Sequence, residues 1–363
     1  MPRVVAATGG FRGAATASEV ALAVARGATA AGWVCDQVPL SDGGEGFAEV
    51  FGGRARLSVV GGPLGLPLEV EWRLSGDGRT AAVESSLASG LDLVGGPEGN
   101  DAVRAGSGGT GQLVAAAVRA GARRVLVGVG PSASTDGGLG ALEALEPHSR
   151  MHGVELVVGC DAMVGFVDSA RLLAPGRGAS PSEVALLSRR LERLVQLYRE
   201  RFGVDVSVIG GAGAGGGLAG GLAALGASLA PGFEVVAEEL DLAGTLECAD
   251  LVVTSEGVLD GVSSGDGVSS GDGVSSGAGV LAGVLGGVAA GVAGLGAGLG
   301  VPVLVLAGDA AGPWVDPEQR ARALDDLPSV DVEVLVERFG RARAVADPCG
   351  CVEEVVAGWI RRS

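Results

Sequence analysis

The chain has 363 residues, of which 47% are apolar, so it can form two domains with substantial hydrophobic cores. Its formal net charge of −17 argues against a nucleic-acid partner, because phosphate contacts require clustered basic side chains. The 67 glycines follow no strict Gly-X-Y period, which excludes collagen, and all 26 basic residues are Arg, so the chain contains no Lys.

Strands and helices are expected to alternate along the chain. Apolar and β-branched runs predict strands at residues 3–7, 34–38, 57–60, 68–74, 124–129, 155–159, 205–209, 251–254 and 301–306. Helical spacing predicts helices at 18–26, 111–119 and 181–202. The strands at 57–60 and 68–74 surround the turn Gly61-Gly62-Pro63 and should form a hairpin. The alternation predicts an α/β fold with a largely parallel sheet, in which binding sites gather at the loops after the strands.

Two unusual segments lie between residues 261 and 308. Residues 261–278 repeat the hexapeptide GVSSGD, which predicts a flexible insert. Each repeat contains the pattern G-x-S-x-G of a catalytic nucleophile elbow, but the strand before it and the helix after it that an elbow requires are absent from the sequence pattern. Residues 276–308 carry no charge and are long enough to cross a bilayer. Their frequent glycines and the strand that follows favour a buried crossover helix, with a membrane helix as the alternative.

The cysteines indicate a reducing compartment. Five of them are scattered at positions 35, 160, 248, 349 and 351, and the opening residues MPRVVAATGG contain no signal-peptide core. We therefore expect free thiols, a cytoplasmic location and no membrane partner. A metal or redox role for the pair Cys349 and Cys351 is the alternative, although no second cysteine pair accompanies it.

Three Gly-rich acidic loops follow predicted strands, at residues 39–46, 130–138 and 254–257. Glycine lets backbone N–H groups approach an anionic ligand, and hydroxyl side chains add further donors. Carboxylates can hold Mg²⁺ or accept a substrate proton. Phosphoryl transfer needs this combination, because its catalysis consists mainly of positioning and charge neutralisation.

These loops and several other segments carry motifs by which the chain resembles the bacterial glycerate kinases related to glycerate 2-kinases. The motifs are D-G-G-E-G at 42–46, E-x-x-x-A-S-G-L at 84–91, S-A-x-x-D-G-G at 132–138, C-D at 160–161, G-A-G at 211–213 and A-D-L-V-x-T-x-E-G-x-L-D at 249–260. They cover nearly the whole chain in order. Where the family has an early Asp and Lys, this sequence has Gly9 and Arg12, and Ala162-Met163-Val164 replaces the family's N-P-L.

The resemblance implies two different α/β domains, one of them flavodoxin-like with a parallel sheet, and a cleft between them. We expect residues 1–60 and 250–363 to form the flavodoxin-like domain and residues 61–249 the second domain. The resemblance further implies a kinase that uses ATP and Mg²⁺ to phosphorylate a hydroxyl of D-glycerate, with the 2-position favoured. The oligomeric state stays open and includes a homo-oligomer.

Site residues follow from the same motifs as hypotheses. Asp42, Asp136 and Asp161 are candidates for the catalytic base or for Mg²⁺ binding, and Arg12 for pairing with a carboxylate or phosphate. The residues expected to bind the nucleotide are Thr110, Ser132, Ser134, Gly211, Gly213, Gly215 and Glu256. The residues expected to hold the metal are Asp42, Glu45 and Asp260.

Alternative functions remain open at this point. The missing lysines favour an impaired or inactive homologue, since losing charge stabilisation costs orders of magnitude in rate. A dinucleotide-binding oxidoreductase is suggested by Gly211-x-Gly213-x-x-Gly216 after a predicted strand, with Glu234 further on. His148 and His152 share a spacing that suits metal binding, but a solvated turn is the simpler interpretation.

Overall fold

The computed structural model describes residues 1–11, 13–259, 287–316, 318, 320, 324 and 329–362. Its contacts divide the chain into two compact units, one made of residues 1–41 and 236–363 and the other of residues 42–235. We call these unit 1 and unit 2. The unit boundaries, after residues 41 and 235, differ from the expected boundaries after residues 60 and 249. The first differs because residues 54–61 pair with a strand of unit 2 and therefore belong to its sheet.

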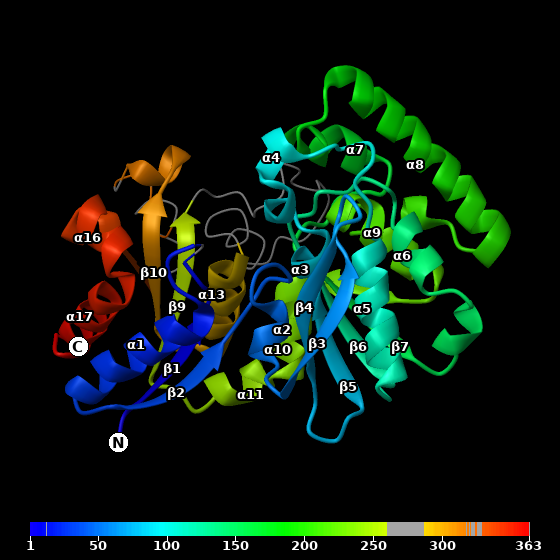
Figure 1. Cartoon of the computed structure of the whole chain (residues 1–363). Coiled ribbons are helices and arrows are strands. Elements are labelled where there is room, and N and C mark those ends of the chain that lie inside the picture. The colour runs from blue at the N-terminus through cyan, green and yellow to red at the C-terminus, as the bar shows by residue number, and fades with distance from the viewer. Residues whose placement is uncertain are drawn as a thin grey trace. The chain divides into compact units, whose positions relative to one another are not determined.

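Unit 1 contains a five-stranded sheet in which every pair is parallel (Figure 1). Its strands are β1 (Arg3–Thr8), β2 (Val34–Pro39), β9 (Leu251–Leu259), β10 (Val303–Ala310) and β11 (Val330–Val334). The order β11-β10-β9-β1-β2 corresponds to 2-1-3-4-5 when the strands are counted along unit 1. This is the flavodoxin-like order, so the predicted fold of this unit is confirmed.

Helices pack on both faces of this sheet. Helix α1 (Ala17–Ala30) and helix α17 (Pro348–Ile360) share one hydrophobic core with Val4, Ala6 and Leu304. Helix α13 (Gly287–Leu299) packs on the opposite face, where a Cβ on Gly296 would approach Val303 to 2.4 Å. Among the described residues of unit 1, further helices are α10 (Gly232–Glu239), which spans the unit boundary, α11 (Leu242–Leu246), α15 (Leu335–Phe339) and α16 (Arg341–Ala346).

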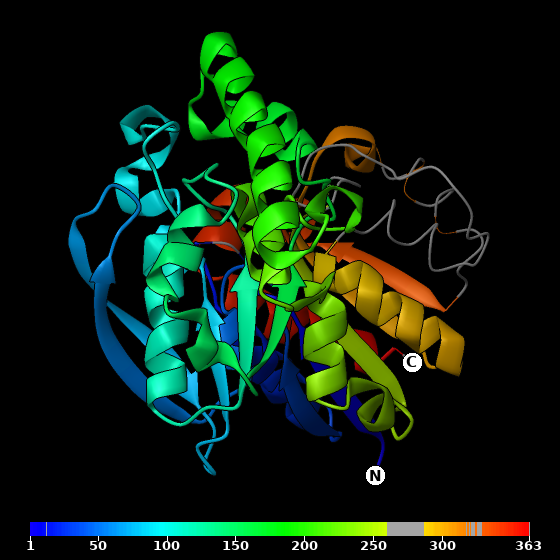
Figure 2. The same ribbon diagram turned by 90° about the vertical axis from the view of Figure 1, so that its right-hand side faces the viewer.

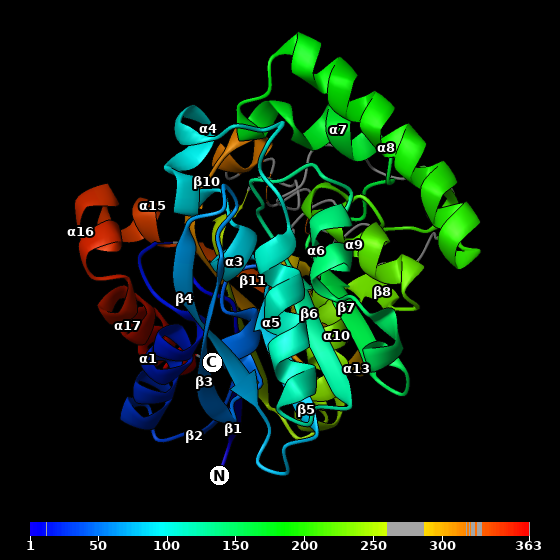
Figure 3. The ribbon, with the colours of Figure 1, turned by 45° about the vertical axis from the view of Figure 1, so that its right-hand side comes forward.

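Unit 2 contains a mixed six-stranded sheet in the order β3-β4-β5-β6-β7-β8 (Figure 3). The strands are β3 (Arg54–Gly61), β4 (Pro67–Leu74), β5 (Thr80–Glu84), β6 (Arg124–Val129), β7 (Glu155–Cys160) and β8 (Ser228–Pro231). Strands β3 and β4 form the predicted antiparallel hairpin, and β4 also pairs antiparallel with β5. The pairs from β5 to β8 are parallel, so their carboxyl ends meet at one edge.

Helices α5 (Gly108–Arg119), α6 (Leu139–Ala144) and α9 (Ala214–Ala224) cover one face of the unit 2 sheet and share its core. Helix α8 (Pro181–Phe202) is the longest helix of this unit and packs with α9 and α7 (Asp168–Leu173) in a second core (Figure 2). Short helices complete the unit: α2 (Phe47–Val50), α3 (Ser86–Ser89) and α4 (Gly96–Gly99).

The predicted strand at 205–209 is wrong. A 3-10 turn at Val206–Val208 occupies this position, and Asp205 caps it by accepting hydrogen bonds from the Ser207 N–H at 3.1 Å and the Ser207 hydroxyl at 2.6 Å. This local side-chain bonding competes with an extended conformation. The dinucleotide-binding fingerprint requires a strand before its glycines, so that alternative loses its structural context.

The uncharged segment at 276–308 is described from residue 287 onward, where it forms α13 and then β10. Among the described residues, no helix combines the length and apolar character needed to cross a membrane. The GVSSGD repeats at 261–278 lie outside the described residues.

Candidate active site

The D-G-G-E-G loop lies directly on the carboxyl ends of β6 and β7 in unit 2. A Cβ on Gly43 would meet the carbonyl oxygen of Gly159 at 2.7 Å, and a Cβ on Gly130 would meet the Cα of Gly44 at 2.7 Å. Gly43 also has a φ of 104°, a conformation that side chains disfavour. The glycines of this motif therefore allow backbone to approach backbone where the parallel strands end, which is where α/β folds place ligands.

Glu84 anchors this loop to the sheet. It ends β5, is buried, and accepts hydrogen bonds from the Ser86 hydroxyl at 2.5 Å and from the backbone N–H groups of Gly46 and Ala48. Burial raises the pKa of the Glu84 carboxyl to about 6, although these hydrogen bonds oppose the shift. The first residue of the E-x-x-x-A-S-G-L motif thus positions the loop that carries Asp42.

Two of the three predicted catalytic carboxylates interact at this edge. Asp161 directly follows β7, and its N–H donates to the carbonyl of Val129 at 3.0 Å. Burial raises the pKa of Asp161 to about 8, and the negative charge of Asp42 adds to the shift. Asp42 in turn accepts a hydrogen bond from the Gly44 N–H at 3.2 Å. Desolvation and the charge of Asp42 thus both favour the protonated form of Asp161.

Arg177 brings a positive charge to the same edge. It ends the 3-10 turn Pro175–Arg177, is only 6% exposed, and donates from Nη1 to the Thr135 hydroxyl at 3.0 Å. Its charge lowers the pKa of Asp161, against the effects of burial and Asp42. The Asn100 amide donates to the carbonyl of Arg177 at 2.9 Å and to that of Ala133 at 3.0 Å, which ties the turn to the loop after β6.

The predicted hydroxyl residues form a buried cluster. The Ser132 and Ser134 hydroxyls lie 3.0 Å apart, and the Thr110 hydroxyl lies 2.8 Å from that of Ser89. Ser132 also donates to the carbonyl of Ser89 at 3.3 Å, so the two pairs belong to one network. Because these side chains are buried, they hold the loop after β6 in place and do not present their hydroxyls to solvent in this structure.

Asp136, the third predicted catalytic carboxylate, accepts several hydrogen bonds from neighbouring segments of unit 2. It accepts from the N–H and the hydroxyl of Ser107 at 2.9 and 2.8 Å, from the Gly138 N–H at 3.0 Å and from the Gly140 N–H at 3.2 Å. These donors belong to the starts of α5 and α6. The carboxylate is thus engaged in joining two helices, and this geometry favours a positioning role for Asp136.

The predicted glycine cradle at 211–217 is buried and tightly packed. Gly215 and Gly216 have φ values of 60° and 72°, inside the segment that begins α9. A Cβ on Gly216 would lie 1.9 Å from the carbonyl oxygen of Ser134. A Cβ on Gly213 would lie 2.3 Å from the carbonyl oxygen of Gly165. Gly211, also at positive φ, accepts a weak bond from the Cys160 thiol.

The other predicted site residues are divided between the units. Glu256 lies on β9 of unit 1, where the Ser255 hydroxyl donates to the carbonyl of Gly9 at 2.8 Å. Glu45 is exposed in unit 2. Arg12 and Asp260 lie outside the described residues. In the described part of the chain, no group of three His, Cys, Asp or Glu side chains is placed to hold a metal ion.

Sequence reasoning missed Arg177 and the anchoring role of Glu84. Arg177 stands in an ordinary-looking stretch, A-P-G-R-G, and its burial, which Arg320 shares, becomes visible only in the structure. Glu84 was noted as part of a motif, but the hydrogen bonds that connect it to Gly46 and Ala48 join residues far apart in sequence.

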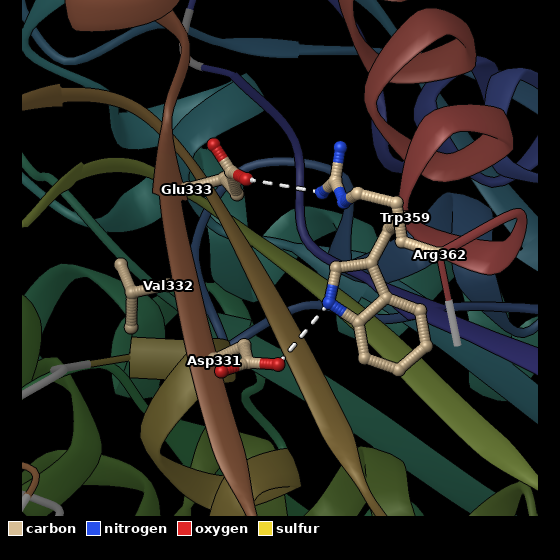
Figure 4. A pocket seen from close by; sticks show the side chains of 5 residues that line it. All are labelled: Asp331, Val332, Glu333, Trp359 and Arg362. Carbon is tan, nitrogen blue, oxygen red and sulfur yellow. Dashed lines mark hydrogen bonds and ion pairs between the residues drawn. The ribbon is translucent and has the colours of Figure 1, made fainter.

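A separate pocket of about 350 Å³ lies in unit 1 (Figure 4). Its lining residues come from β11 and the end of α17: Asp331, Val332, Glu333, Trp359 and Arg362. The Trp359 indole N–H donates to Asp331 at 3.1 Å, and Arg362 lies 3.9 Å from Glu333. None of the predicted site residues lines this pocket.

The alternative metal ligands have other contacts. His148 lies in a 3-10 turn (His148–Met151), and its Nε2 is 3.0 Å from the carbonyl oxygen of Leu142. The five cysteines are free thiols, and Cys351 is buried in the core of unit 1.

A flavodoxin-like unit together with Asp-Gly-Gly loops at the ends of parallel strands defines an α/β protein of the class that places its ligand sites at strand ends. The model of the glycerate kinase family matches residues 4–148 and 146–322. The chain therefore belongs to the glycerate kinase family, as the sequence motifs predicted, and this family membership indicates a kinase.

Individual relatives agree with this membership. The glycerate 2-kinase of Escherichia coli K12 is 33% identical over 301 residues, which cover 72% of this chain and 78% of that protein. The glycerate kinase of Bacillus subtilis is 32% identical over 296 residues, or 71% of this chain and 77% of that protein. A crystal structure from Salmonella typhimurium LT2, assigned as glycerate kinase 2, superimposes with a TM-score of 0.76 at 27% identity and covers 99% of both chains.

Proposed function

We propose that this protein is a glycerate kinase that transfers a phosphoryl group from ATP to a hydroxyl of D-glycerate, with Mg²⁺ as the metal and the 2-position as the preferred acceptor. The observation that carries the proposal is the Asp42–Asp161 pair beside the D-G-G-E-G loop, at the carboxyl ends of parallel strands in a member of the glycerate kinase family. The name of the E. coli relative, glycerate 2-kinase, supports the choice of the 2-position.

Asp161 is the proposed general base. It accepts the proton of the glycerate hydroxyl while that oxygen bonds to the γ-phosphorus of ATP, and the bond from phosphorus to the leaving ADP oxygen breaks. A general base works best when its pKa lies near the working pH, and the pKa of Asp161 is raised to about 8. Asp136 keeps the loop after β6 in position through its bonds to Ser107 and the α6 backbone.

The chemistry of the site suits Mg²⁺ and a phosphorylated ligand. Mg²⁺ keeps several waters and is usually held by one or two carboxylates together with substrate phosphates, so it does not need three protein ligands. Asp42 would hold the ion, with Asp161 beside it. When bound, Mg²⁺ would neutralise charge on the phosphates. Arg177 supplies positive charge next to Asp161 in a chain that has no Lys.

The proposed substrate is a small hydroxy acid. ATP as donor and the free thiols support a cytoplasmic location for the reaction.

The test is turnover of ATP with D-glycerate and Mg²⁺, with the product position read by ³¹P and ¹H NMR. In the wild type we expect kcat/KM to rise with pH as Asp161 loses its proton. Asp161→Asn should lower kcat by about 10²–10⁴-fold, the usual contribution of a general base, while circular dichroism shows that the variant is folded. The matched control is Asp92→Asn, because Asp92 is exposed on another turn of unit 2. Full activity in Asp161→Asn would refute the assignment.

A second candidate is a family member that binds ATP without turning it over. The absence of every Lys and the replacement of the family's N-P-L by Ala162-Met163-Val164 favour it. Saturable ATP binding, measured by calorimetry, with no phosphoglycerate formed from well-folded protein would establish this alternative and reject the kinase proposal.

A further inference from the structure

Strand β3 forms one edge of the unit 2 sheet and carries exposed apolar side chains. It pairs with β4, and within the part of the chain that the structure describes the sheet order ends with it. Leu57 is 61% exposed, Val59 is 72% exposed, and Ala55 is also exposed on the same face. We call these three residues the edge strip. Proteins usually protect such an edge with charges, bulges or cover, since unpaired strands attract other strands.

The backbone register shows which groups of β3 point away from β4. In an antiparallel pair, residues alternate between exchanging hydrogen bonds with the partner strand and pointing their N–H and C=O groups outward. The Gly62 N–H bonds to the carbonyl of Leu66 at 2.6 Å, and the next pair, Gly61 and Pro67, cannot exchange bonds because Pro has no N–H. Counting back in twos from Gly61, the outward groups belong to Val59, Leu57 and Ala55.

An independent contact confirms this register. The outward N–H of Gly61 donates to the side-chain oxygen of Gln112 on α5 at 2.8 Å. Gln112 therefore closes one end of the free edge, and the positive-φ turn at Gly53 closes the other. Between these ends, the same three residues of the edge strip supply both the outward backbone groups and the exposed apolar side chains.

The edge strip is symmetric about Leu57. Two copies of β3 can lie antiparallel with Leu57 facing Leu57 of the partner subunit, Ala55 facing the partner's Val59, and Val59 facing the partner's Ala55. Each of these pairs can exchange two backbone hydrogen bonds, and their side chains form one continuous apolar row. A two-fold interface needs such a self-complementary patch. We propose that β3 pairs with β3 of a second copy of this chain and joins two unit 2 sheets into one continuous sheet.

The charges of the chain determine how the proposed dimerisation should depend on salt concentration. Arg54 and Arg56 alternate with the edge strip and therefore project to the other face of β3, whereas Glu69, Glu71 and Arg73 of β4 lie opposite the strip on its own face. The net charge of −17 makes two copies repel each other at long range. Added salt screens this repulsion, so dimerisation should strengthen as ionic strength rises. This inference concerns unit 2 alone and does not depend on the proposed activity.

Sedimentation velocity of the full chain tests the proposal. With increasing protein concentration, the weight-average mass should rise from 35.5 kDa toward twice that value, and more steeply at higher salt. Leu57→Glu should stay monomeric, because it places two carboxylates opposite each other at the centre of the pair. The matched control is Leu186→Glu, since Leu186 is 43% exposed on α8 and outside the edge strip. Circular dichroism checks that each variant is folded. If Leu57→Glu does not fold, the milder Leu57→Thr replaces it, because Thr also favours strands, and this variant should weaken the dimer.

A disulfide tests the register. Residues facing each other in a hydrogen-bonded antiparallel pair have Cα atoms about 5.5 Å apart, within the range that a disulfide spans. Leu57→Cys, made together with Cys248→Ser to remove an exposed thiol, should form a covalent dimer under mild oxidation, whereas Leu186→Cys in the same background should not. A monomeric wild type at every concentration, a Leu57→Glu dimer as strong as the wild type, or a dimer that Leu57→Cys cannot cross-link would each overturn the proposal.

Discussion

Replacing Glu84 by Gln removes a buried carboxyl whose pKa is raised from 4.5 to about 6, mainly by burial. A folded-state pKa above the unfolded value means that folding favours the protonated form. The resulting stabilisation is complete below about pH 4.5 and is lost as the pH rises through about 6. At 1.36 kcal/mol per pKa unit, this shift corresponds to about 2 kcal/mol.

The assay is urea unfolding followed by circular dichroism at intervals between pH 4 and pH 7.5. We subtract the free energy of unfolding of Glu84→Gln from that of the wild type at each pH, so that the other titrating groups cancel. This difference should fall by about 2 kcal/mol between pH 4.5 and pH 7. Glu69→Gln, at an exposed position of the neighbouring strand β4, is the matched control for the substitution itself. A flat difference for Glu84→Gln, or one that rises with pH, would refute the reasoning.

Two further substitutions test the packing around the loop after β6. Gly216→Ala should lower the free energy of unfolding by about 2–4 kcal/mol, because Gly216 has a φ of 72° and a Cβ there would lie 1.9 Å from the carbonyl of Ser134. Gly176→Ala, which meets no atom within 4 Å, should leave the melting temperature nearly unchanged, and equal effects of the two would contradict this account. Tyr198→Phe removes the hydrogen bond from the buried Tyr198 hydroxyl to the carbonyl of Gly137 at 2.9 Å and should cost about 1–3 kcal/mol in urea unfolding. No loss in Tyr198→Phe would show that this bond does not hold the loop.

Elements with strong local signals were predictable from the sequence. Helix α8 begins and ends where expected because Ser180 and Glu183 form a capping box, Pro181 opens the first turn and Gly203 closes the helix in a left-handed conformation. The strand at 124–129 and the β3–β4 hairpin also agree with the prediction. In each case the residues that specify the element lie within it or next to it.

Short strands without such signals were not predictable. Strands β5, β8 and β11 are each five residues or fewer, and no strand was expected at their positions. The opposite error occurred at 205–209, where an apolar alternation suggested a strand but Asp205 capped a turn. Strand formation depends on neighbouring strands that a single sequence does not reveal.

The candidate site also combines features that local sequence predicts with features that only the fold determines. Local motifs predict Asp42, Asp161 and the Ser132–Ser134 loop as candidates, because glycines, hydroxyls and carboxylates at strand ends carry a recognisable chemistry. Only the tertiary structure decided that Asp161 lies beside Asp42 and Arg177, in surroundings that raise its pKa, and that Asp136 is engaged by backbone donors. The physical reason is that residue type is local, whereas burial, the proximity of charges and the pKa values that follow from them depend on segments brought together by folding.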